Sequence, residues 1–412
     1  MPAPRFGRPL LARFPLEPGC VYLNHGTVGV TPNAVMQARS ALLDEIERHP
    51  ARFMLRELAH LRASTSASPA DPGAPSRLRA AAERVGAFLG CSGDALAFVD
   101  NASSGVNAVL RSIALAPGDE IVVTDHAYGG VARAVAFLAA ERGAVVKTVA
   151  WPVPIDDPAR CVASLERALG PRTRLAVLDH VTSETALVLP VAQLAAACRA
   201  HGVAVLVDGA HAPGAIEVRI ETLGVDWYSA NLHKWAHAPR GCGILWAAPE
   251  RQSMVHFPVV SWGRNRGFRD EFEHTPTADP TSYLAAPEGI AMLHEWGFDA
   301  CVAYMHDLAW EAAAMLTARW GTRFEIPRHM VGTMVTVPLP GEAGATEDDA
   351  EHVRLALLVE DRIEVPLSAW SGRLWVRVSA QIYNDRADID RLADAVLRRV
   401  AAAPVRSPMT TA

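Results

Sequence analysis

Lys234 is the residue whose type and setting most clearly suggest covalent chemistry. The chain has two lysines, Lys147 and Lys234, although it carries many arginines. A lysine amine can form a Schiff base with a carbonyl compound, which a guanidinium cannot do near neutral pH. An isolated lysine is ordinarily a solvated surface residue. The neighbouring Trp227, Tyr228 and Trp235 are a poor setting for a merely solvated side chain, so they favour a functional lysine.

A carboxylate upstream of this lysine adds a second chemical group. Asp208 ends the apolar run VAVLV at 203–207, and its number is 26 below that of Lys234, which leaves room for one more strand. A carboxylate at the carboxyl end of a strand can pair with a protonated pyridine nitrogen, and that pairing lets a pyridoxal phosphate ring act as an electron sink. An aspartate before a glycine is also a common turn or capping residue. Alone, this pattern leaves both interpretations open.

A third segment could hold a phosphate group. Small and hydroxyl residues at 101–107, NASSGVN, follow the apolar run LAFVD at 96–100 and open a predicted helix. A helix N-terminus offers free N–H groups and the positive end of the helix dipole, which together bind anions. Ordinary N-capping would explain the same composition. The order along the chain is more informative than any one segment: phosphate cradle, aromatic residue, carboxylate, lysine and a late arginine.

The elements around these residues predict an α/β fold. Strand-length apolar runs alternate with amphipathic helical segments through the middle of the chain, which indicates βαβ units and a mostly parallel central sheet with helices on both faces. Three of the runs end in polar or aromatic clusters, at Asp125–Tyr128, His180–Ser183 and Asp208–His211. Sites in open α/β sheets form beyond the carboxyl ends of the strands. We therefore expect these clusters to converge.

The pattern of the sequence predicts how the chain is organised. Residues 31–296 form a large domain, and 297–404 change to an α+β pattern that indicates a smaller C-terminal domain. Residues 1–30 are expected to pack near the active site. The Pro-, Ser- and Ala-rich stretch at 63–76 predicts a flexible loop, and 405–412 predict a frayed tail.

Composition and charge exclude several classes of protein. The chain has 412 residues, 50% of them hydrophobic, and a net charge of −6. It lacks the basic stripe of a nucleic-acid-binding protein and an apolar run long enough for a transmembrane helix. Its six cysteines have no C-x-x-C spacing, which favours reduced thiols in the cytoplasm over a disulfide framework or a metal site. The N-terminal residues have no apolar core of a signal peptide. We expect a cytoplasmic protein without nucleic-acid, membrane or metal partners.

Two motifs together resemble a known family. VDGAHAPG at 207–214 and NLHKW at 231–235 resemble the fold-type I pyridoxal phosphate enzymes of the class V aminotransferase family, and most closely its isopenicillin N epimerase branch. The resemblance covers most of the chain, from YLNHGTVGVTP at 22–32 to RVSAQIYN at 377–384. It implies the type I fold, with pyridoxal phosphate as the cofactor.

The resemblance implies a role for each residue near the cofactor. Lys234 would bind the cofactor covalently and move the proton at the substrate Cα, Asp208 would pair with the pyridine nitrogen, and His211 would lie near the phenolate oxygen. Tyr128 would stack on the ring, with His126 as the alternative. The remaining implied contacts are Ala102, Ser103, Asn231 and His233 at the phosphate and Ser183 at the phenolate.

The same resemblance implies a substrate site. Arg377 would bind the α-carboxylate of an amino acid with two hydrogen bonds, and Asn24 and His25 would line the pocket. The residues that face the substrate side chain are not fixed. In SWGRNRG the sequence leaves two alternatives, a substrate contact or a surface loop, for Trp262, Arg264 and Arg266.

A segment before the C-terminal domain implies a homodimer. In the family, a Gly-Thr-Arg-Asp segment reaches into the site of the neighbouring subunit, and its counterpart here is Pro276–Asp279. Thr277 would therefore contact the partner's phosphate. Ala278 stands where the family has arginine, so a substrate or interface contact is missing. No cysteine follows Cys301, which argues against a desulfurase that forms a persulfide on a late cysteine.

The implied chemistry begins with loss of the substrate's Cα proton. From there, epimerisation or β-elimination of the C–S lyase type on an amino acid or amino-acid conjugate is the expected function, in specialised metabolism. The alternatives are an aminotransferase or a decarboxylating or oxidative enzyme, and more remotely a non-catalytic protein that binds pyridoxal phosphate. An epimerase needs a second acid or base on the far face, which His25, His126 or Tyr128 could supply. A β-lyase needs little beyond the shared residues.

Overall fold

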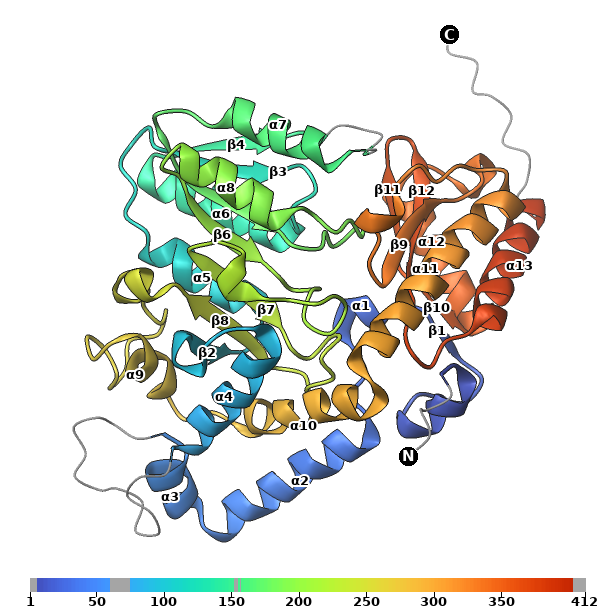
Figure 1. The fold of residues 1–412 in the computed structure, drawn as a ribbon. Helices are drawn as coiled ribbons and strands as arrows, with labels where there is room; N and C mark the ends of the chain where they lie inside the picture. Colours follow the sequence, from blue (N-terminus) through green and yellow to red (C-terminus); the bar gives the residue numbers. More distant parts are fainter. Residues whose placement is uncertain (1–5, 60–74, 152–154, 156, 403–412) are drawn as a thin grey trace.

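The structure is a computed structural model that describes residues 6–59, 75–151, 155 and 157–402. A large α/β domain contains a seven-stranded sheet, and a smaller domain with a three-stranded sheet lies beside it (Figure 1). This is the predicted fold class. Most of the predicted loop at 63–76 and all of the predicted tail at 405–412 lie outside the described residues.

A mostly parallel sheet forms the centre of the large domain. Its strands are β2 (Leu96–Val99), β3 (Glu120–Thr124), β4 (Val145–Val149), β5 (Thr173–Asp179), β6 (Ala204–Asp208), β7 (Trp227–Asn231) and β8 (Gly243–Ala247). The strand order is β2-β8-β7-β6-β5-β3-β4, and β8 alone runs antiparallel to its neighbours. The carboxyl ends of the other strands therefore share one edge.

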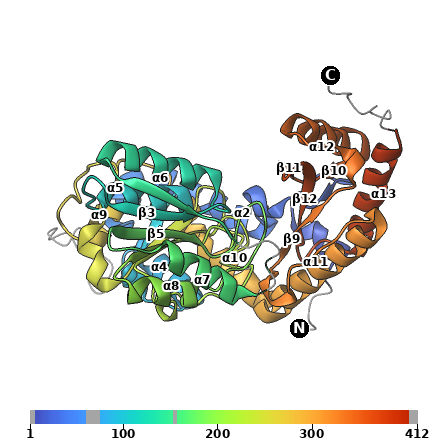
Figure 2. The same cartoon turned by 90° about the horizontal axis from the view of Figure 1, so that it is seen from above.

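Helices cover both faces of this sheet (Figure 2). The helices of the large domain are α4 (Arg77–Leu89), α5 (Ala102–Ser112), α6 (Gly129–Arg142), α7 (Pro158–Ala168), α8 (Val191–Ala200), α9 (Phe268–Glu273) and α10 (Thr281–Trp296). Alternate residues of β5 belong to different cores. Ala176 and Leu178 pack with α7 and α8, whereas Leu175 and Val177 pack with α5 and α6. Burial on both faces explains why the strands read as continuous apolar runs.

The small domain is built on an antiparallel sheet. Its strands β9 (Met334–Pro338), β11 (Leu367–Trp370) and β12 (Arg373–Ser379) have the order β11-β12-β9, and its helices are α11 (Phe298–Trp320), α12 (Glu347–Asp361) and α13 (Arg386–Ala402). Alternate residues of β12, Leu374, Val376 and Val378, belong to the core of this domain. Successive side chains of a strand point to opposite faces. Trp375 and Arg377 therefore point out of this core.

The N-terminal residues connect the two domains. β1 (Val21–Tyr22) pairs in parallel with β10 (Ile363–Glu364) of the small domain. The chain continues through α1 (His25–Val28) into α2 (Asn33–Arg48), which packs against α10 of the large domain (Figure 1). The remaining short helical turns are α3 (Pro50–Arg52), a π-helical turn at Phe53–Glu57, and 3₁₀ turns at Arg8–Arg13, Gly93–Ala95, Ile220–Thr222, Pro249–Met254, Arg328–Met330 and Gly341–Ala343.

The cysteines are all free thiols. Those that are buried are Cys161, Cys198, Cys242 and Cys301, and those that are half-buried are Cys20 and Cys91. Burial raises the pKa of the Cys198 thiol to about 12, so this group is protonated at neutral pH. Within the described ranges, no helix is both long enough and apolar enough to cross a membrane.

Gly29 lies where the chain touches the segment that contains Lys234. Its φ is +69°, and a Cβ at this position would overlap the carbonyl oxygen of His233. Gly118 also has a positive φ, +85°, but a Cβ there would have nothing within 4 Å. A comparison of substitutions at Gly29 and Gly118 therefore separates the cost of backbone strain from the cost of crowding.

We predict that Gly29→Ala lowers the free energy of unfolding by about 3 kcal/mol, because overpacking against backbone adds to the strain of a left-handed φ. Gly118→Ala should cost about 1 kcal/mol, the strain alone. Urea unfolding followed by circular dichroism measures both. Equal losses would contradict the proposed crowding at His233.

Candidate active site

The shared edge of the sheet opens into a cavity of about 420 Å³. Loops that follow β2, β3, β5, β6 and β7 form its walls, and β12 of the small domain adds one side chain. Among the residues singled out in the sequence, those that line this cavity are Ala102, Ser103, Tyr128, Ser183, Asp208, His211, Asn231, His233, Lys234 and Arg377. The structure thus brings together groups that lie up to 275 positions apart in the chain.

Lys234 is buried and follows β7 at the cavity wall. Its Nζ lies 3.1 Å from Nε2 of His211. Burial and the charge of Arg377 together lower the pKa of Lys234 to about 7, while Asp208 opposes the shift. A substantial fraction of this amine is therefore neutral near pH 7. Only the neutral amine can attack a carbonyl carbon or accept a proton.

Two buried carboxyl groups lie side by side at the ends of β5 and β6. Asp179 and Asp208 are partners in the register of these strands, and both line the cavity. Burial raises the pKa of each, and the charge of Asp208 raises the pKa of Asp179 further. The N–H of Ala210 donates to Oδ1 of Asp208 at 3.0 Å, and this bond and Lys234 both lower the pKa of Asp208. Asp208 is therefore the carboxyl group that ionises first.

Asp179 is a site residue that was not singled out in the sequence. Its run, LAVLD, ends in an aspartate just as VAVLVD does at Asp208. Both runs end at the same edge of a parallel sheet. The repeated strand-end aspartate was the signal that could have identified Asp179.

The N-terminus of α5 forms one end of the cavity. Oδ1 of Asn101 accepts a hydrogen bond from the N–H of Ser104 at 2.9 Å, and the N–H of Ala102 donates to Oδ1 of Asn231 at 2.8 Å. Ala102 therefore does not present a free N–H, which differs from its implied role. Because an N–H usually makes one strong hydrogen bond, the N–H and hydroxyl of Ser103 are the donors left for an anion. No hydrogen bond within the described residues occupies either.

His233 completes this end of the cavity. Its Nδ1 lies 2.8 Å from the carbonyl oxygen of Cys242, so Nδ1 carries a proton. Burial lowers the pKa of His233, which leaves Nε2 unprotonated until an anion binds nearby. An anionic ligand would favour the charged imidazolium and gain a second donor from it.

Two buried polar atoms on the cavity wall have no protein partner. They are Nδ1 of His211 and Nε of Arg377. Arg377 also donates from Nη1 to the carbonyl oxygen of Ser183 at 2.5 Å and from Nη2 to the hydroxyl of Thr27 at 2.8 Å. Burial lowers the pKa of Arg377 to about 10, so it stays positively charged at neutral pH. Buried polar atoms without partners are rare in proteins, so a ligand against this wall would supply the hydrogen bond that each atom lacks.

This set of groups fits pyridoxal phosphate. Lys234 suits its aldehyde, Asp208 suits its pyridine nitrogen and Ser103 suits its phosphate. The unpartnered Nδ1 of His211 marks a further contact on the same wall. The free guanidinium edge of Arg377 suits the carboxylate of a second molecule, an amino acid.

Tyr128, rather than His126, lies at the cavity. Tyr128 precedes α6, lines the cavity and is half exposed. His126 lines a separate cavity. Its Nδ1 lies 2.8 Å from Oγ1 of Thr185, and its ring packs edge-on near Trp370 at a centroid distance of 6.2 Å. Tyr128 is thus the aromatic side chain available to stack on a ring in the cavity.

His25 does not line the cavity, contrary to its implied place in the substrate pocket. It is fully buried behind Lys234. Its Nε2 lies 3.0 Å from the carbonyl oxygen of Lys234, and its Nδ1 lies 3.0 Å from the hydroxyl of Tyr383. Burial lowers the pKa of His25 well below its usual range, so it is neutral. Its contacts position the backbone of Lys234.

Asn24 also faces away from the cavity. Its Nδ2 donates to Oε1 of Glu364 at 2.9 Å, and its Oδ1 accepts a hydrogen bond from the hydroxyl of Thr27. The neighbouring Gly26 and Thr27 line the cavity instead. Asn24 therefore acts through Thr27, which contacts Arg377.

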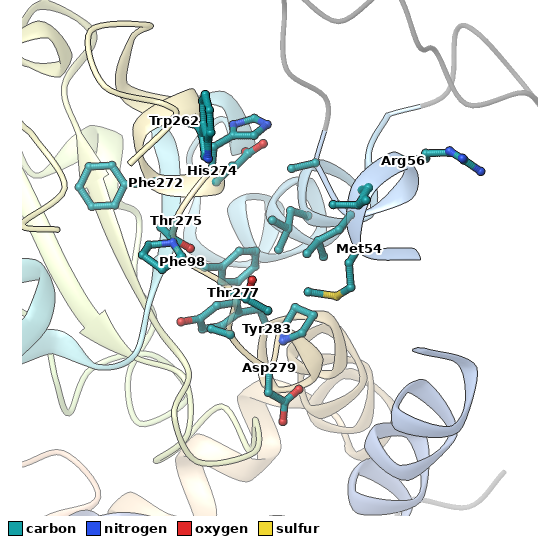
Figure 3. A pocket seen from close by; sticks show the side chains of 18 residues that line it. Met54, Arg56, Phe98, Trp262, Phe272, His274, Thr275, Thr277, Asp279 and Tyr283 are labelled. Atoms are coloured by element: carbon teal, nitrogen blue, oxygen red, sulfur yellow. The ribbon is translucent and has the colours of Figure 1, made fainter. Parts of the chain in front are cut away.

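Thr277 lies in a different pocket, of about 360 Å³, in the segment before α10 (Figure 3). Met54, Phe98 and Trp262 contribute to the same pocket. Within one chain, Thr277 does not reach the cavity that contains Lys234. The residues left open in the sequence, Trp262, Arg264 and Arg266, do not line that cavity either, which favours a surface loop in the single chain.

The lowered pKa of Lys234 predicts how cofactor attachment depends on pH. Below pH 7 the amine is protonated and cannot bond to an aldehyde, whereas above pH 7 it is neutral. We expect the rate at which the apo-protein binds pyridoxal phosphate covalently to rise with pH around a midpoint of about 7. Stopped-flow absorbance measures this rate, with Lys234→Ala as the baseline.

A variant of Arg377 tests the cause of this shift. Arg377→Gln removes a positive charge that lowers the pKa of Lys234, so the midpoint should rise by about one pH unit. Arg377→Lys keeps the charge and should leave the midpoint nearly unchanged. A midpoint near that of a free lysine in the unmodified protein would contradict the proposed environment.

Comparisons with known proteins show what the chain is similar to. The model of the aminotransferase class-V family matches residues 54–392. A putative L-cysteine desulfhydrase of Oryza sativa subsp. japonica is 31% identical over 93% of this chain and 84% of its own length. Isopenicillin N epimerase of Streptomyces clavuligerus is 32% identical over 93% of this chain and 96% of its own length.

A solved structure supports the fold. A variant of C-DES with glycine covalently linked to its pyridoxal phosphate cofactor superposes with a TM-score of 0.76 at 21% identity. The superposition covers 96% of this chain and 99% of that one. At this identity the likeness establishes the fold alone.

Proposed function

The chain belongs to the aminotransferase class-V family, and we propose on that premise that it catalyses β-elimination from an amino acid, cleaving a carbon–sulfur bond. It is an enzyme whose cofactor is pyridoxal 5′-phosphate. Among its relatives are proteins named as L-cysteine desulfhydrase and isopenicillin N epimerase, so lyase and epimerase chemistry are the two functions to separate. We place this activity in specialised metabolism.

The proposal rests on the bases that line the cavity. Lys234 has a pKa of about 7, near the value at which a general base works best at neutral pH. The imidazoles of His211 and His233 have lowered pKa values because they are buried. One base at the Cα of the substrate is enough for elimination, because the leaving group departs from Cβ.

Epimerisation needs a second acid or base on the opposite face of Cα. Of the residues considered for this role, His25 is buried behind Lys234 and His126 lines another cavity. Tyr128 is left as the group that could supply a proton from the far side. Epimerisation is therefore the second candidate, and it depends on Tyr128.

Most of the residues named at the cavity would bind the cofactor or the substrate, and Lys234 would transfer a proton. When bound, pyridoxal phosphate supplies an electron sink that stabilises negative charge at the Cα of an amino acid. Asp208 would hold a proton on the pyridine nitrogen, and Arg377 would orient the substrate α-carboxylate with its unpartnered Nε. Lys234 would take the Cα proton, and the positive charge of Arg377 favours the neutral amine that this requires. Ser103 and His233 would hold the phosphate.

We predict that the holoenzyme releases pyruvate and ammonia from S-substituted cysteines. Incubation in D₂O separates the candidates. Elimination gives pyruvate, whereas epimerisation gives deuterium at Cα with inverted configuration, and transamination gives a keto acid that keeps the side chain. Racemised amino acid without pyruvate, lost on Tyr128→Phe, would establish the epimerase instead.

Lys234→Ala should lower turnover by a factor of at least about 10³, because it removes both the covalent anchor and the base. Lys147→Ala is the matched control. Lys147 pairs with Glu120 at 2.9 Å on the far edge of the sheet and should be dispensable. Turnover retained by Lys234→Ala would contradict catalysis by this lysine.

We also propose a homodimer in which Thr277 contacts the phosphate in the partner's cavity. The pocket around Thr277 is bordered by the exposed apolar residues Leu55 and Trp262, which are 75% and 83% exposed, and Val260 nearby is 73% exposed. Large apolar side chains gathered on one surface commonly mark a protein interface. A homodimer would bury them and give Thr277 a function.

Light scattering should give twice the mass of one chain. Thr277→Val should weaken binding of pyridoxal phosphate roughly tenfold, the loss expected for a hydrogen bond to a charged group. Thr275→Val is the control, because Thr275 lines the same pocket. An active monomer, or equal affinities for the two variants, would contradict the proposed contact.

A further inference from the structure

A second cavity, of about 230 Å³, lies between the two domains next to the one that contains Lys234. Residues from the loops after β3 and β5 form its wall on the large domain, and residues of β9, β11 and β12 form its wall on the small domain. Neither the cofactor nor the proton transfer described above uses it. Its position and chemistry suggest what the side chain of the substrate could be.

The two cavities share a wall. Ser183 lines the first cavity, and the adjacent Glu184 and Thr185 line the second. Two neighbouring strands of the small domain form hydrogen bonds with this wall. Arg377 donates to the carbonyl oxygen of Ser183 at 2.5 Å, and the hydroxyl of Thr336 donates to that of Glu184 at 2.6 Å. A substrate held at Arg377 therefore lies beside the second cavity.

The register of β12 also places the two cavities side by side. Trp375 and Arg377 are two residues apart and point to the same face, so their Cα atoms are about 7 Å apart. Trp375 lines the second cavity and Arg377 lines the first. The carboxylate site at Arg377 and the second cavity are therefore about one extended side chain apart on the same strand face.

Aromatic rings form much of the wall of the second cavity. The rings of Trp370 and Trp375 have centroids 5.3 Å apart at an interplanar angle of 53°. The indole N–H of Trp375 donates to the carbonyl oxygen of Trp370 at 2.9 Å, so this polar atom is already satisfied. Phe324 and His126 add further rings. Aromatic faces attract cations through their quadrupoles.

The charges around this cavity are mainly negative. Asp125, Glu184 and Glu325 line it, and Arg323 is the cation that lines it. Burial lowers the pKa of His126, so its ring is neutral at pH 7. Within the described residues, Glu184, Glu325 and Arg323 form no ion pair. Oδ1 of Asp125 accepts a hydrogen bond from the N–H of Trp151 at 3.0 Å and lies 3.8 Å from Nε2 of His126. The side chains that line the cavity therefore carry a net negative charge beside aromatic rings, although Glu184 also interacts electrostatically with Arg377.

We propose that this cavity is the subsite for the distal end of the substrate and that it binds an organic cation, such as a quaternary ammonium group. The aromatic rings attract the cation directly. The carboxylates make the electrostatic potential around it more negative, which also favours a cation. The substrate would thus be an amino acid that carries a positive charge at the end of its side chain. The reaction of such a substrate rests on the proposed function. The binding test described next does not depend on that function.

Matched probes test the charge preference by itself. S-(2-trimethylammonioethyl)-α-methylcysteine and the neutral S-(3,3-dimethylbutyl)-α-methylcysteine have the same shape, and neither has a Cα proton, so they bind without turnover. Calorimetry with the holoenzyme should show that the cationic probe binds roughly tenfold more tightly. Equal affinity, tighter binding of the neutral probe, or tighter binding of an S-(2-carboxyethyl) probe would overturn the proposal.

Variants of the cavity test where this preference arises. Trp370→Ala and Glu325→Gln should each reduce the ratio of affinities to about two. Trp370→Phe keeps an aromatic face at this position and should therefore keep most of the preference for the cationic probe. Glu141→Gln on α6 is the control, because Glu141 is exposed and lines neither cavity. An unchanged ratio in both Trp370→Ala and Glu325→Gln would overturn the proposal.

The same compounds with a Cα proton separate this inference from the proposed function. If the ratio of affinities holds but no pyruvate forms, the subsite stands and the β-elimination is wrong. If pyruvate forms equally well from the cationic and neutral compounds and their affinities are equal, the reaction stands and the subsite is wrong.

Discussion

The active site depends on the burial of one amino group. Lys234 lies in an interior where a charged ammonium is poorly solvated, close to the guanidinium of Arg377, and both effects lower its pKa to about 7. Asp208 limits this shift from the other side. Burying a lysine costs free energy unless it is neutral or paired. At this position the neutral amine, which burial favours, is the form that the chemistry requires.

Much of the surrounding structure positions this amine without touching a ligand. His25 contacts the backbone carbonyl of Lys234, and Gly29 lets the N-terminal segment approach the carbonyl of His233. Asn231, at the end of β7, fixes the first turn of α5 through the N–H of Ala102. These contacts connect the lysine to α1 and to the phosphate end of the cavity. The geometry of the site is therefore a property of several elements at once.

The small domain connects the reaction to substrate choice. One face of β12 contributes Arg377 to the first cavity and Trp375 to the second. The loop at 183–185 is the wall between them, and both Arg377 and Thr336 hold it in place. Any movement of the small domain relative to the sheet would therefore change the carboxylate site and the side-chain cavity together.

Residue patterns along the chain were enough to predict the fold class, the cofactor and the residues at the strand ends. Apolar runs indicated which strands are buried, and a strand that ends in a carboxylate or leads to a lysine brings it to the shared edge of a parallel sheet. In the structure, Asp208, Lys234 and Ser103 all line the same cavity. The folded structure was needed to show that His25 is buried and that Thr277 lies in another pocket. Local patterns specify the element on which a residue lies, whereas packing between distant segments, such as Thr27 and Arg377, decides which way a side chain points and what it contacts.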